Sequence, residues 1–369
     1  MLRVGKLMIS PAEYNSDMRY ASQVSTPDDI LWFSAGSICG LVASPLEYDR
    51  ICASKKNGVT VFRESDFEST SHVETAEKIA ARYHLDGFSV PGDFPLITAD
   101  KLRETGLLIE PVEKSFFPER EFKERFEVEY ITQSLRAAEA GCRHAIDILR
   151  ESDVNSRGEL VWQNNVLTSE ILRSEIDCVL LKHGCLPTGT ICAGSVQSSQ
   201  PHNQGSGALY AGTPIVMDIF PKSANTGYWG DLTRTVVKGK APDVVKRAFE
   251  AVYEARELAK GLLVKGASPA EIHIAAAKSM ESKGFYTGTG DNGDYGFFHG
   301  LGHGVGLDIH EEPRISPRNG ELLKGGEVVT VEPGLYYAGW GGVRLEDMVY
   351  ISPDGKSELL TEIETVLEI

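Results

Sequence analysis

Residues 299–313 read HGLGHGVGLDIHEEP, and this stretch sets the architecture expected for the second half of the chain. His299 and His303 stand four positions apart, a spacing that would bring both rings to one side of a helix. Glycines at positions 300, 302, 304 and 306 oppose that helix, because each costs about 1 kcal/mol relative to alanine. We therefore predict an extended, closely packed segment and not a helical pair of metal-binding histidines.

Acidic residues inside apolar, strand-like runs surround this stretch. The runs are PIVMDIF (214–220), DLTRTVV (231–237), EVVTVEPGLYY (327–337) and VRLEDMVYI (343–351), and they contain Asp218, Asp231, Glu332 and Glu346. An ionised carboxylate in a dry core is costly unless it is paired or bound to a metal. One such residue is more often a satisfied structural group or a solvated strand end, but four together indicate a binding site.

Asp218 and Asp231 end and begin two predicted strands that PKSANTGYWG (221–230) joins as a hairpin loop. Adjacent strands would bring the two carboxylates together. Carboxylates held that close repel each other, and one takes up a proton unless a divalent cation lies between them. The pair therefore favours a metal site.

Strand periodicity places Arg344 and Glu346 on one face, with Val343, Leu345 and Asp347 on the other. An arginine beside a ligand carboxylate has two possible uses. It orients that carboxylate, or it binds a substrate carboxylate through its bidentate fork. A plain surface ion pair is the alternative, and the apolar flanks disfavour it.

His303 would add one nitrogen ligand to an otherwise oxygen-rich set. This mixture suits Mn, Fe, Co or Zn better than Ca or Mg, and we expect two divalent ions with manganese favoured. Carboxylate bridges in such sites hold two ions about 3.5 Å apart, where they share a hydroxide and polarise a carbonyl. Amide hydrolysis is the reaction that this arrangement predicts.

The 369 residues suit two domains. Short strands such as GVTVFR (58–63) and a helical stretch, VETAEKIAARYH (73–84), predict a small α/β domain over residues 1–120. Residues 121–369 then form a mixed α+β domain. Its expected helices include APDVVKRAFEAVYEARELAKGLL (241–263), with Val245, Phe249, Val252, Ala255, Leu258 and Leu262 at helical spacing.

Composition excludes several classes of partner. The formal net charge of -16 opposes nucleic acid, and no apolar run approaches the length of a membrane span. The N-terminal residues do not form a signal peptide. Six cysteines without a Cys-x-x-Cys pair are expected to be reduced and buried, so we predict a cytoplasmic protein.

These motifs resemble those of the pita-bread metallopeptidases, which include methionine aminopeptidase, Xaa-Pro aminopeptidase and prolidase. The matching segments are GDLTRT (230–235), HGLGHGVGLDIHEEP (299–313), TVEPGLYY (330–337) and GVRLED (342–347), after the strand that carries Asp218. The resemblance implies a pita-bread catalytic domain preceded by a creatinase-type N-terminal domain, which the short methionine aminopeptidases lack. It also implies a homodimer.

The resemblance further implies a role for each ligand. Asp231 and Glu346 would bridge both metals, and Asp218 would bind one of them. His303 and Glu332 would bind the other, and Glu332 would also shuttle protons. The two aspartates are thirteen positions apart (231 − 218), two more than is usual in the family, so the loop between them should be longer.

Four further residues are implied as substrate-binding or catalytic groups. His310 and His202, the latter within SSQPHNQG (198–205), resemble histidines that bind substrate and stabilise the tetrahedral intermediate. His299 resembles a pocket residue of the Xaa-Pro branch. Arg344 is a candidate for holding a dipeptide's free carboxylate, but a similar arginine occurs in the aminopeptidases.

The favoured hypothesis is hydrolysis of the bond between an N-terminal residue and a following proline in short peptides, by an aminopeptidase or a dipeptidase. A second hypothesis is a non-peptidase enzyme on the same fold, such as a metal-dependent lyase of a small acid or another hydrolase. A third is a non-catalytic binding protein, which the complete ligand set disfavours.

Overall fold

The computed structural model describes residues 2–291 and 293–369, which divide into two units, Met1–Arg120 and Glu121–Ile369. The first unit contains a mixed sheet with the strand order β4–β3–β2–β1–β5–β6. Its elements are β1 (Val4–Pro11), α1 (Ser16–Ser22), β2 (Asp29–Ala35), β3 (Ile38–Ala43), α2 (Tyr48–Ser54), β4 (Val59–Arg63), η1 (Glu64–Phe67), α3 (His72–Tyr83), β5 (Gly87–Val90), α4 (Leu96–Glu104), β6 (Leu108–Pro111) and η2 (Pro118–Glu121).

Alternating side chains bury both faces of this sheet. Leu7 and Phe33 belong to a core that includes residues of α3 and α4, whereas Met8 and Trp32 belong to a second core with α1 and α2. Because neighbours on a strand point to opposite faces, a sheet covered by helices on both sides needs apolar residues at consecutive positions. This is the small α/β unit that the sequence pattern predicts.

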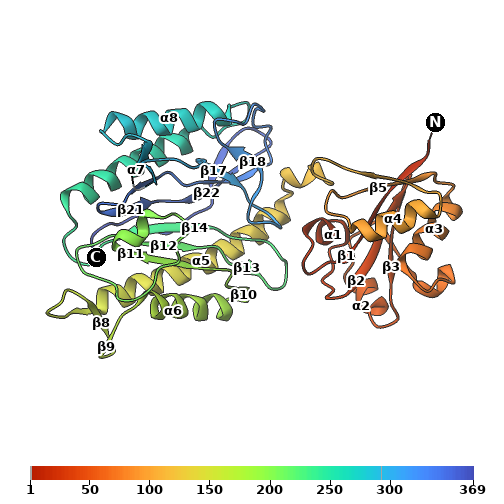
Figure 1. The fold of residues 1–369 in the computed structure, drawn as a ribbon, viewed down its shortest axis with the longest axis horizontal. Coiled ribbons are helices and arrows are strands. Elements are labelled where there is room, and N and C mark those ends of the chain that lie inside the picture. The colour runs from red at the N-terminus through yellow and green to blue at the C-terminus, as the bar shows by residue number, and fades with distance from the viewer. Residues whose placement is uncertain (1, 292) are drawn as a thin grey trace. The chain divides into compact units, whose positions relative to one another are not determined.

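The second unit places two groups of strands between helix pairs, with α5 and α6 on one side and α7 and α8 on the other (Figure 1). The helices are α5 (Arg125–Glu151), α6 (Ser169–Lys182), η3 (Ser195–Ser199), α7 (Asp243–Leu262) and α8 (Pro269–Ser282). The main strands are β11 (Ile191–Gly194), β12 (Ile215–Ile219), β14 (Leu232–Val236), β17 (Gly302–Gly304), β18 (Glu311–Ile315), β19 (Val328–Val331), β20 (Gly334–Tyr337), β21 (Gly341–Arg344), β22 (Asp347–Ile351) and β23 (Ser357–Leu359). Shorter strands are β7 (Asp153–Val154), β8 (Leu160–Trp162), β9 (Asn165–Val166), β10 (Cys185–Leu186), β13 (Lys222–Ser223), β15 (Gly288–Gly290) and β16 (Gly293–Tyr295).

The buried face of α7 differs from the predicted one. Val245, Val252 and Ala255 are buried, but Leu258 and Leu262 are 42% and 38% exposed. Alanines fill the rest of the buried face, at positions 248, 251 and 259. Small side chains let two helices approach closely, so this helix buries alanines against its neighbours while two leucines remain outside.

The cysteines are all free thiols, as the sequence suggested, but their burial is mixed. Cys142, Cys185 and Cys192 are buried, whereas Cys52 and Cys178 are exposed, so the prediction of uniform burial is wrong at these two positions. Among the residues that the structure describes, no helix combines the length and apolar character needed to cross a bilayer.

Candidate metal centre

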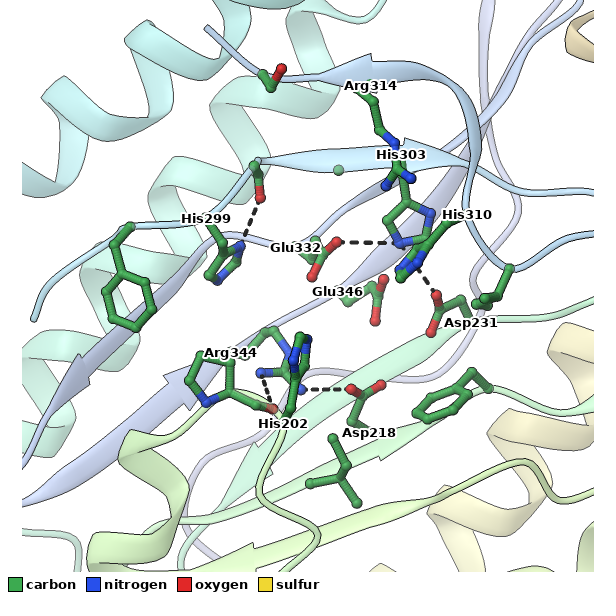
Figure 2. A pocket seen from close by; sticks show the side chains of 18 of the residues that line it. His202, Asp218, Asp231, His299, His303, His310, Arg314, Glu332, Arg344 and Glu346 are labelled. Atoms are coloured by element: carbon green, nitrogen blue, oxygen red, sulfur yellow. Dashed lines mark hydrogen bonds and ion pairs between the residues drawn. The ribbon is translucent and has the colours of Figure 1, made fainter. Parts of the chain in front are cut away.

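Two neighbouring antiparallel strands bring Asp218 and Asp231 to the same cleft (Figure 2). Asp218 lies in β12 opposite Thr233 of β14, and Asp231 immediately precedes β14. Residues two apart on a strand share a face, so Asp231, Thr233 and Asp218 face the same side. The thirteen-residue separation leaves this register intact, because the connection contains β13, which pairs separately with β10.

Glu332 and Glu346 lie at strand breaks, which corrects the prediction of two uninterrupted strands over 327–337 and 343–351. β19 pairs with β22 and β20 pairs with β21, so the chain changes partner at residues 332–333 and again at 345–346. Pro333 contributes to the first break because it has no backbone N–H to donate. At the second break, the N–H of Glu346 donates to the carbonyl of Thr233 at 3.0 Å.

His303 lies on β17, in the extended conformation predicted from the surrounding glycines. A Cβ atom added at Gly302 would lie 2.0 Å from the Thr330 carbonyl oxygen, and one at Gly304 would lie 2.2 Å from that of Glu312. The backbone of neighbouring segments therefore lies against Gly302 and Gly304, and only glycine fits at these two positions beside His303.

Four of the predicted ligands converge. One ligand atom from each of Asp231, His303 and Glu346 lies within 4.8 Å of the others. The His303 Nε2 atom is 3.7 Å from Asp231 Oδ2 and 3.4 Å from Glu332 Oε1. Its Nδ1 lies 3.1 Å from the Gly304 carbonyl oxygen, which can only accept, so the Nε2 lone pair faces the carboxylates.

Burial shifts the pKa values of this cluster in the direction that a cation site requires. Burial and then the neighbouring carboxylates raise the pKa of Asp231 and of Glu346 well above the ordinary range, and burial raises that of Glu332 to about 7. Burial also lowers the pKa of His303 to about 3, which keeps its ring neutral. A divalent cation would offset both the burial and the mutual repulsion of these carboxylates, so the donor set fits a metal.

Arg344 forms its ion pair with Asp218, a different carboxylate from the Glu346 partner that the strand pattern suggested. The Nη2–Oδ2 distance is 2.6 Å. Arg344 also donates from Nε to the Thr233 hydroxyl at 3.2 Å and from Nη1 to the Tyr336 hydroxyl at 3.0 Å. Asp218 is therefore held by Arg344 at the edge of the cluster.

The predicted histidines line the same cleft, which has a volume of about 970 Å³. His299 donates from Nδ1 to the Gly300 carbonyl at 2.7 Å, so its Nε2 accepts from the Tyr336 hydroxyl at 3.0 Å. Burial lowers the pKa of His299 to about 3. The His310 ring meets the His303 ring edge-on at 4.4 Å, whereas His202 is exposed at the rim.

Three ionisable residues of the cleft lining escaped the sequence analysis. Arg314 on β18 and Arg318 after it bring exposed guanidinium groups to the lining, and His273 of α8 stacks on Phe297 with ring centroids 5.0 Å apart. Of these three residues, only Arg314 could have been recognised from the sequence pattern. It is a charged residue between the buried Pro313 and Ile315 within a strand.

The sequence profile of metallopeptidase family M24 matches residues 129–353. The Xaa-Pro dipeptidase of Pyrococcus furiosus is 37% identical over 171 residues, which are 46% of each chain. The uncharacterised peptidase YqhT of Bacillus subtilis is 29% identical over 249 residues, 66% of this chain and 64% of that one. The chain thus spans about half to two-thirds of the length of these curated relatives.

Solved structures match over nearly the whole chain. The prolidase from Pyrococcus furiosus superposes with a TM-score of 0.80 at 24% identity, covering 98% of this chain and 96% of that one. The X-Pro aminopeptidase from Thermotoga maritima gives a TM-score of 0.84 at 22% identity, covering 100% and 98%. At these identities the similarity establishes the fold.

Proposed function

Because the chain belongs to metallopeptidase family M24, we propose that it uses two divalent cations to hydrolyse the bond between an N-terminal residue and a following proline. The family resemblance and the expected α+β pita-bread fold are both confirmed by the comparisons. The proposed activity depends chiefly on one observation, the buried convergence of Asp231, His303 and Glu346 beside a large cleft.

In this proposal each ligand keeps the role that the family resemblance implies. Asp231 and Glu346 would hold both ions, His303 and Glu332 would hold one of them, and Asp218 would hold the other. Cations held by these residues would supply an activated water molecule and polarisation of the scissile carbonyl. Glu332, whose Oε1 lies 3.4 Å from His303, is the proposed proton shuttle.

The remaining residues bind and orient the peptide. His310 and His202 lie on the cleft lining, where each can donate a hydrogen bond to a substrate carbonyl. His299 is fixed by Gly300 and Tyr336, so it contributes a rigid wall. These assignments follow the sequence-based prediction.

A dipeptide's free carboxylate needs a cation that is accessible. Arg344 is only 3% exposed, and its donors are engaged by Asp218, Thr233 and Tyr336. Arg314 is exposed on the lining, and in Figure 2 Glu332 and Glu346 lie between it and Arg344. We therefore assign carboxylate binding to Arg314, which favours a dipeptidase, and give Arg344 the task of orienting Asp218.

The test measures release of the N-terminal residue from Xaa-Pro dipeptides and tripeptides. Protein stripped with a chelator is reloaded with Mn, Co, Zn or Fe, and Asp231→Asn serves as the control. We expect metal-dependent cleavage, with dipeptides preferred, and loss of that cleavage in Asp231→Asn. Metal binding without peptide cleavage would instead support a lyase or another hydrolase, and absence of metal binding would support a binding protein. Manganese as the metal, homodimerisation and a cytoplasmic location stay predictions.

A further inference from the structure

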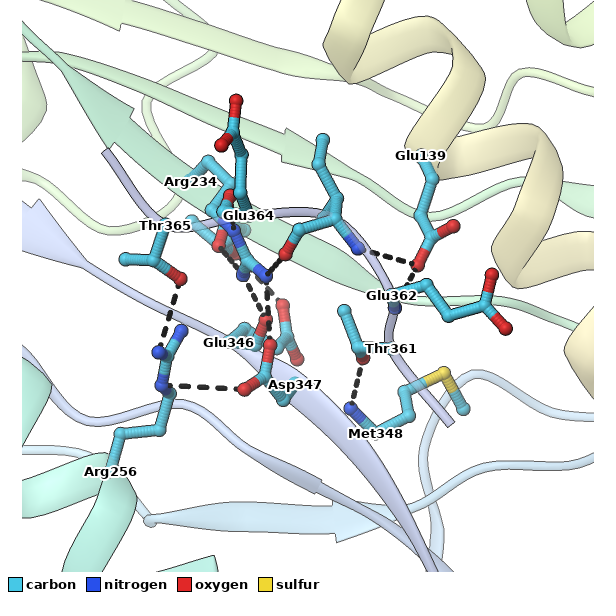
Figure 3. A network of polar contacts seen from close by, with 12 residues as sticks. Glu139, Arg234, Arg256, Glu346, Asp347, Met348, Thr361, Glu362, Glu364 and Thr365 are labelled. Carbon is cyan, nitrogen blue, oxygen red and sulfur yellow. Dashed lines mark hydrogen bonds and ion pairs between the residues drawn. The ribbon is translucent and has the colours of Figure 1, made fainter. Parts of the chain in front are cut away.

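Arg234 follows Thr233 on β14, so strand alternation turns its side chain away from the face that carries Thr233. It is 2% exposed and lies among Glu346, Asp347 and Glu364 (Figure 3). All of its side-chain nitrogens donate hydrogen bonds. Nε donates to the Glu364 carbonyl (3.3 Å), Nη1 to the carbonyls of Thr233 (3.0 Å) and Glu346 (2.6 Å), and Nη2 to Asp347 Oδ1 (2.9 Å) and the Ile363 carbonyl (3.0 Å). One guanidinium thus joins β14, the break before β22 and the segment near residue 363.

Glu346 is held by two consecutive residues of β14. Its N–H donates to the Thr233 carbonyl at 3.0 Å, and its own carbonyl accepts from Arg234 at 2.6 Å. Its carboxylate oxygen Oε2 accepts from the Thr233 hydroxyl at 2.8 Å. The main chain at Glu346 belongs to neither flanking strand, so these bonds replace the strand ladder that would otherwise fix its position.

Asp347 explains why a charged arginine is tolerated at this buried position. It forms ion pairs with Arg234 at 2.9 Å, with Lys260 at 2.9 Å and with Arg256 at 3.3 Å. Burial alone would raise the pKa of Asp347, but these three cations lower it overall. The cluster therefore contains three cations, the buried carboxylate of Asp347 and the half-exposed carboxylate of Glu257, which contacts Arg256 and Lys260.

We propose that Arg234 is a positioning residue that holds the Glu346 carboxylate ready to bridge two cations. This rests on the two-metal site of the proposed function, but not on the identity of the substrate. Arg234 acts on the peptide group of Glu346 and does not touch the cleft. Without it, Glu346 would lose one of the three hydrogen bonds that join it to β14, and the bridging ligand could rotate away from one of the two ions.

The test is metal binding by purified, chelator-stripped protein, measured by calorimetric titration with Mn²⁺ and by metal analysis after desalting. The variants are Arg234→Met and Arg234→Lys, where lysine keeps the charge but cannot span the same acceptors. The matched control is Arg256→Met, which removes another buried cation from Asp347 without touching Glu346.

We expect wild type and Arg256→Met to bind two ions. In both Arg234 variants one of the two ions should bind about 10- to 100-fold more weakly, as is typical when an outer partner of a ligand is lost. Thermal unfolding of the metal-free proteins identifies folded variants, and Arg234→Lys provides the test if Arg234→Met does not fold. Raising the Mn²⁺ concentration should restore the second ion.

The proposal is overturned if folded Arg234 variants bind both ions as wild type does, or if Arg256→Met weakens binding to the same extent. Failure of the two-metal site in the proposed function looks different, because then wild type itself would bind fewer than two ions.

Discussion

Arg344 and Asp218 form a direct ion pair at 2.6 Å, although a ligand carboxylate is expected to face a metal. The arginine is almost fully buried, and hydrogen bonds to Thr233 and Tyr336 fix it. Asp218 is therefore a proposed ligand that a buried arginine holds in place. In metal-free protein Arg344 supplies the positive charge that a cation would otherwise provide.

Replacing Arg344 by methionine should destabilise the metal-free protein more than the metal-loaded protein. Removing one member of a buried ion pair costs about 3–5 kcal/mol because the other charge is left uncompensated. A bound cation would compensate Asp218 and reduce that loss. Urea unfolding of wild type and variant, with and without Mn²⁺, gives the comparison, and an equal loss in both states would contradict the expectation.

Replacing Arg314 by alanine should raise KM for Xaa-Pro dipeptides by about 10- to 100-fold, the equivalent of one charged hydrogen-bonded contact. Xaa-Pro-Xaa tripeptides should change much less, because their carboxylate lies one residue further away. Steady-state kinetics on both substrates provide the measurement. Arg318→Ala, which removes a second guanidinium from the lining, is the control, and equal effects of the two substitutions would indicate general charge attraction instead.

Replacing Gly302 by alanine should destabilise the protein by about 3 kcal/mol or more, because the new methyl group would overlap the Thr330 carbonyl oxygen. Gly261→Ala is the matched control: this helical glycine has open space around it, and alanine there should add about 0.5–1 kcal/mol. Urea unfolding followed by far-UV circular dichroism measures both. The structure of β17 would be in error if Gly302→Ala unfolded at the wild-type midpoint.

Replacing His299 by glutamine should reduce the acid sensitivity of metal-free protein. The folded pKa of His299 is about 3 and its unfolded value is about 6.5, so the unfolded chain takes up the proton first. This contribution to stability is complete above pH 6.5 and falls by about 1.4 kcal/mol per pH unit as the pH decreases toward 3. Between pH 6.5 and 5, wild type should lose about 2 kcal/mol more than the variant in urea unfolding. If the stabilities of wild type and His299→Gln changed equally with pH, this prediction would be wrong.

The proposed ligands could be identified from the sequence because each stands in a short segment with its own pattern. Asp231, His303 and Glu346 are acidic or imidazole groups beside glycines and apolar strand residues, and these local contrasts are visible without a structure. The alternation of Arg344 and Glu346 also held, since both line the cleft while Asp347 faces Arg234. The predicted alternation was correct because the break between β21 and β22 leaves the side chains of Arg344 and Glu346 on the same side.

Features that depend on distant segments could not be predicted. The pairing of Arg344 with Asp218 joins residues 126 positions apart, and it required β12 to lie beside β21. The change of strand partner at Glu332 and Glu346 depends on the pairing of β19 with β22 and of β20 with β21. In the sequence, only Pro333 indicated such a break. The burial of α7 alanines in place of Leu258 and Leu262 likewise reflects how closely neighbours approach, which hydrophobicity does not encode.

Glu346 and Asp347 are adjacent carboxylates that face opposite sides, one toward the proposed cation site and the other toward three fixed cations. A shift of one residue during folding that moved Asp347 to the place of Glu346 would move Met348 to the place of Asp347. The proposed cation site would keep a carboxylate, but the three buried cations would lose theirs. The same shift would bring Val343 to the place of Gly342, where even a methyl group would lie 2.1 Å from the Ser198 carbonyl oxygen. Charge on one side and packing at Gly342 therefore both oppose a misaligned strand.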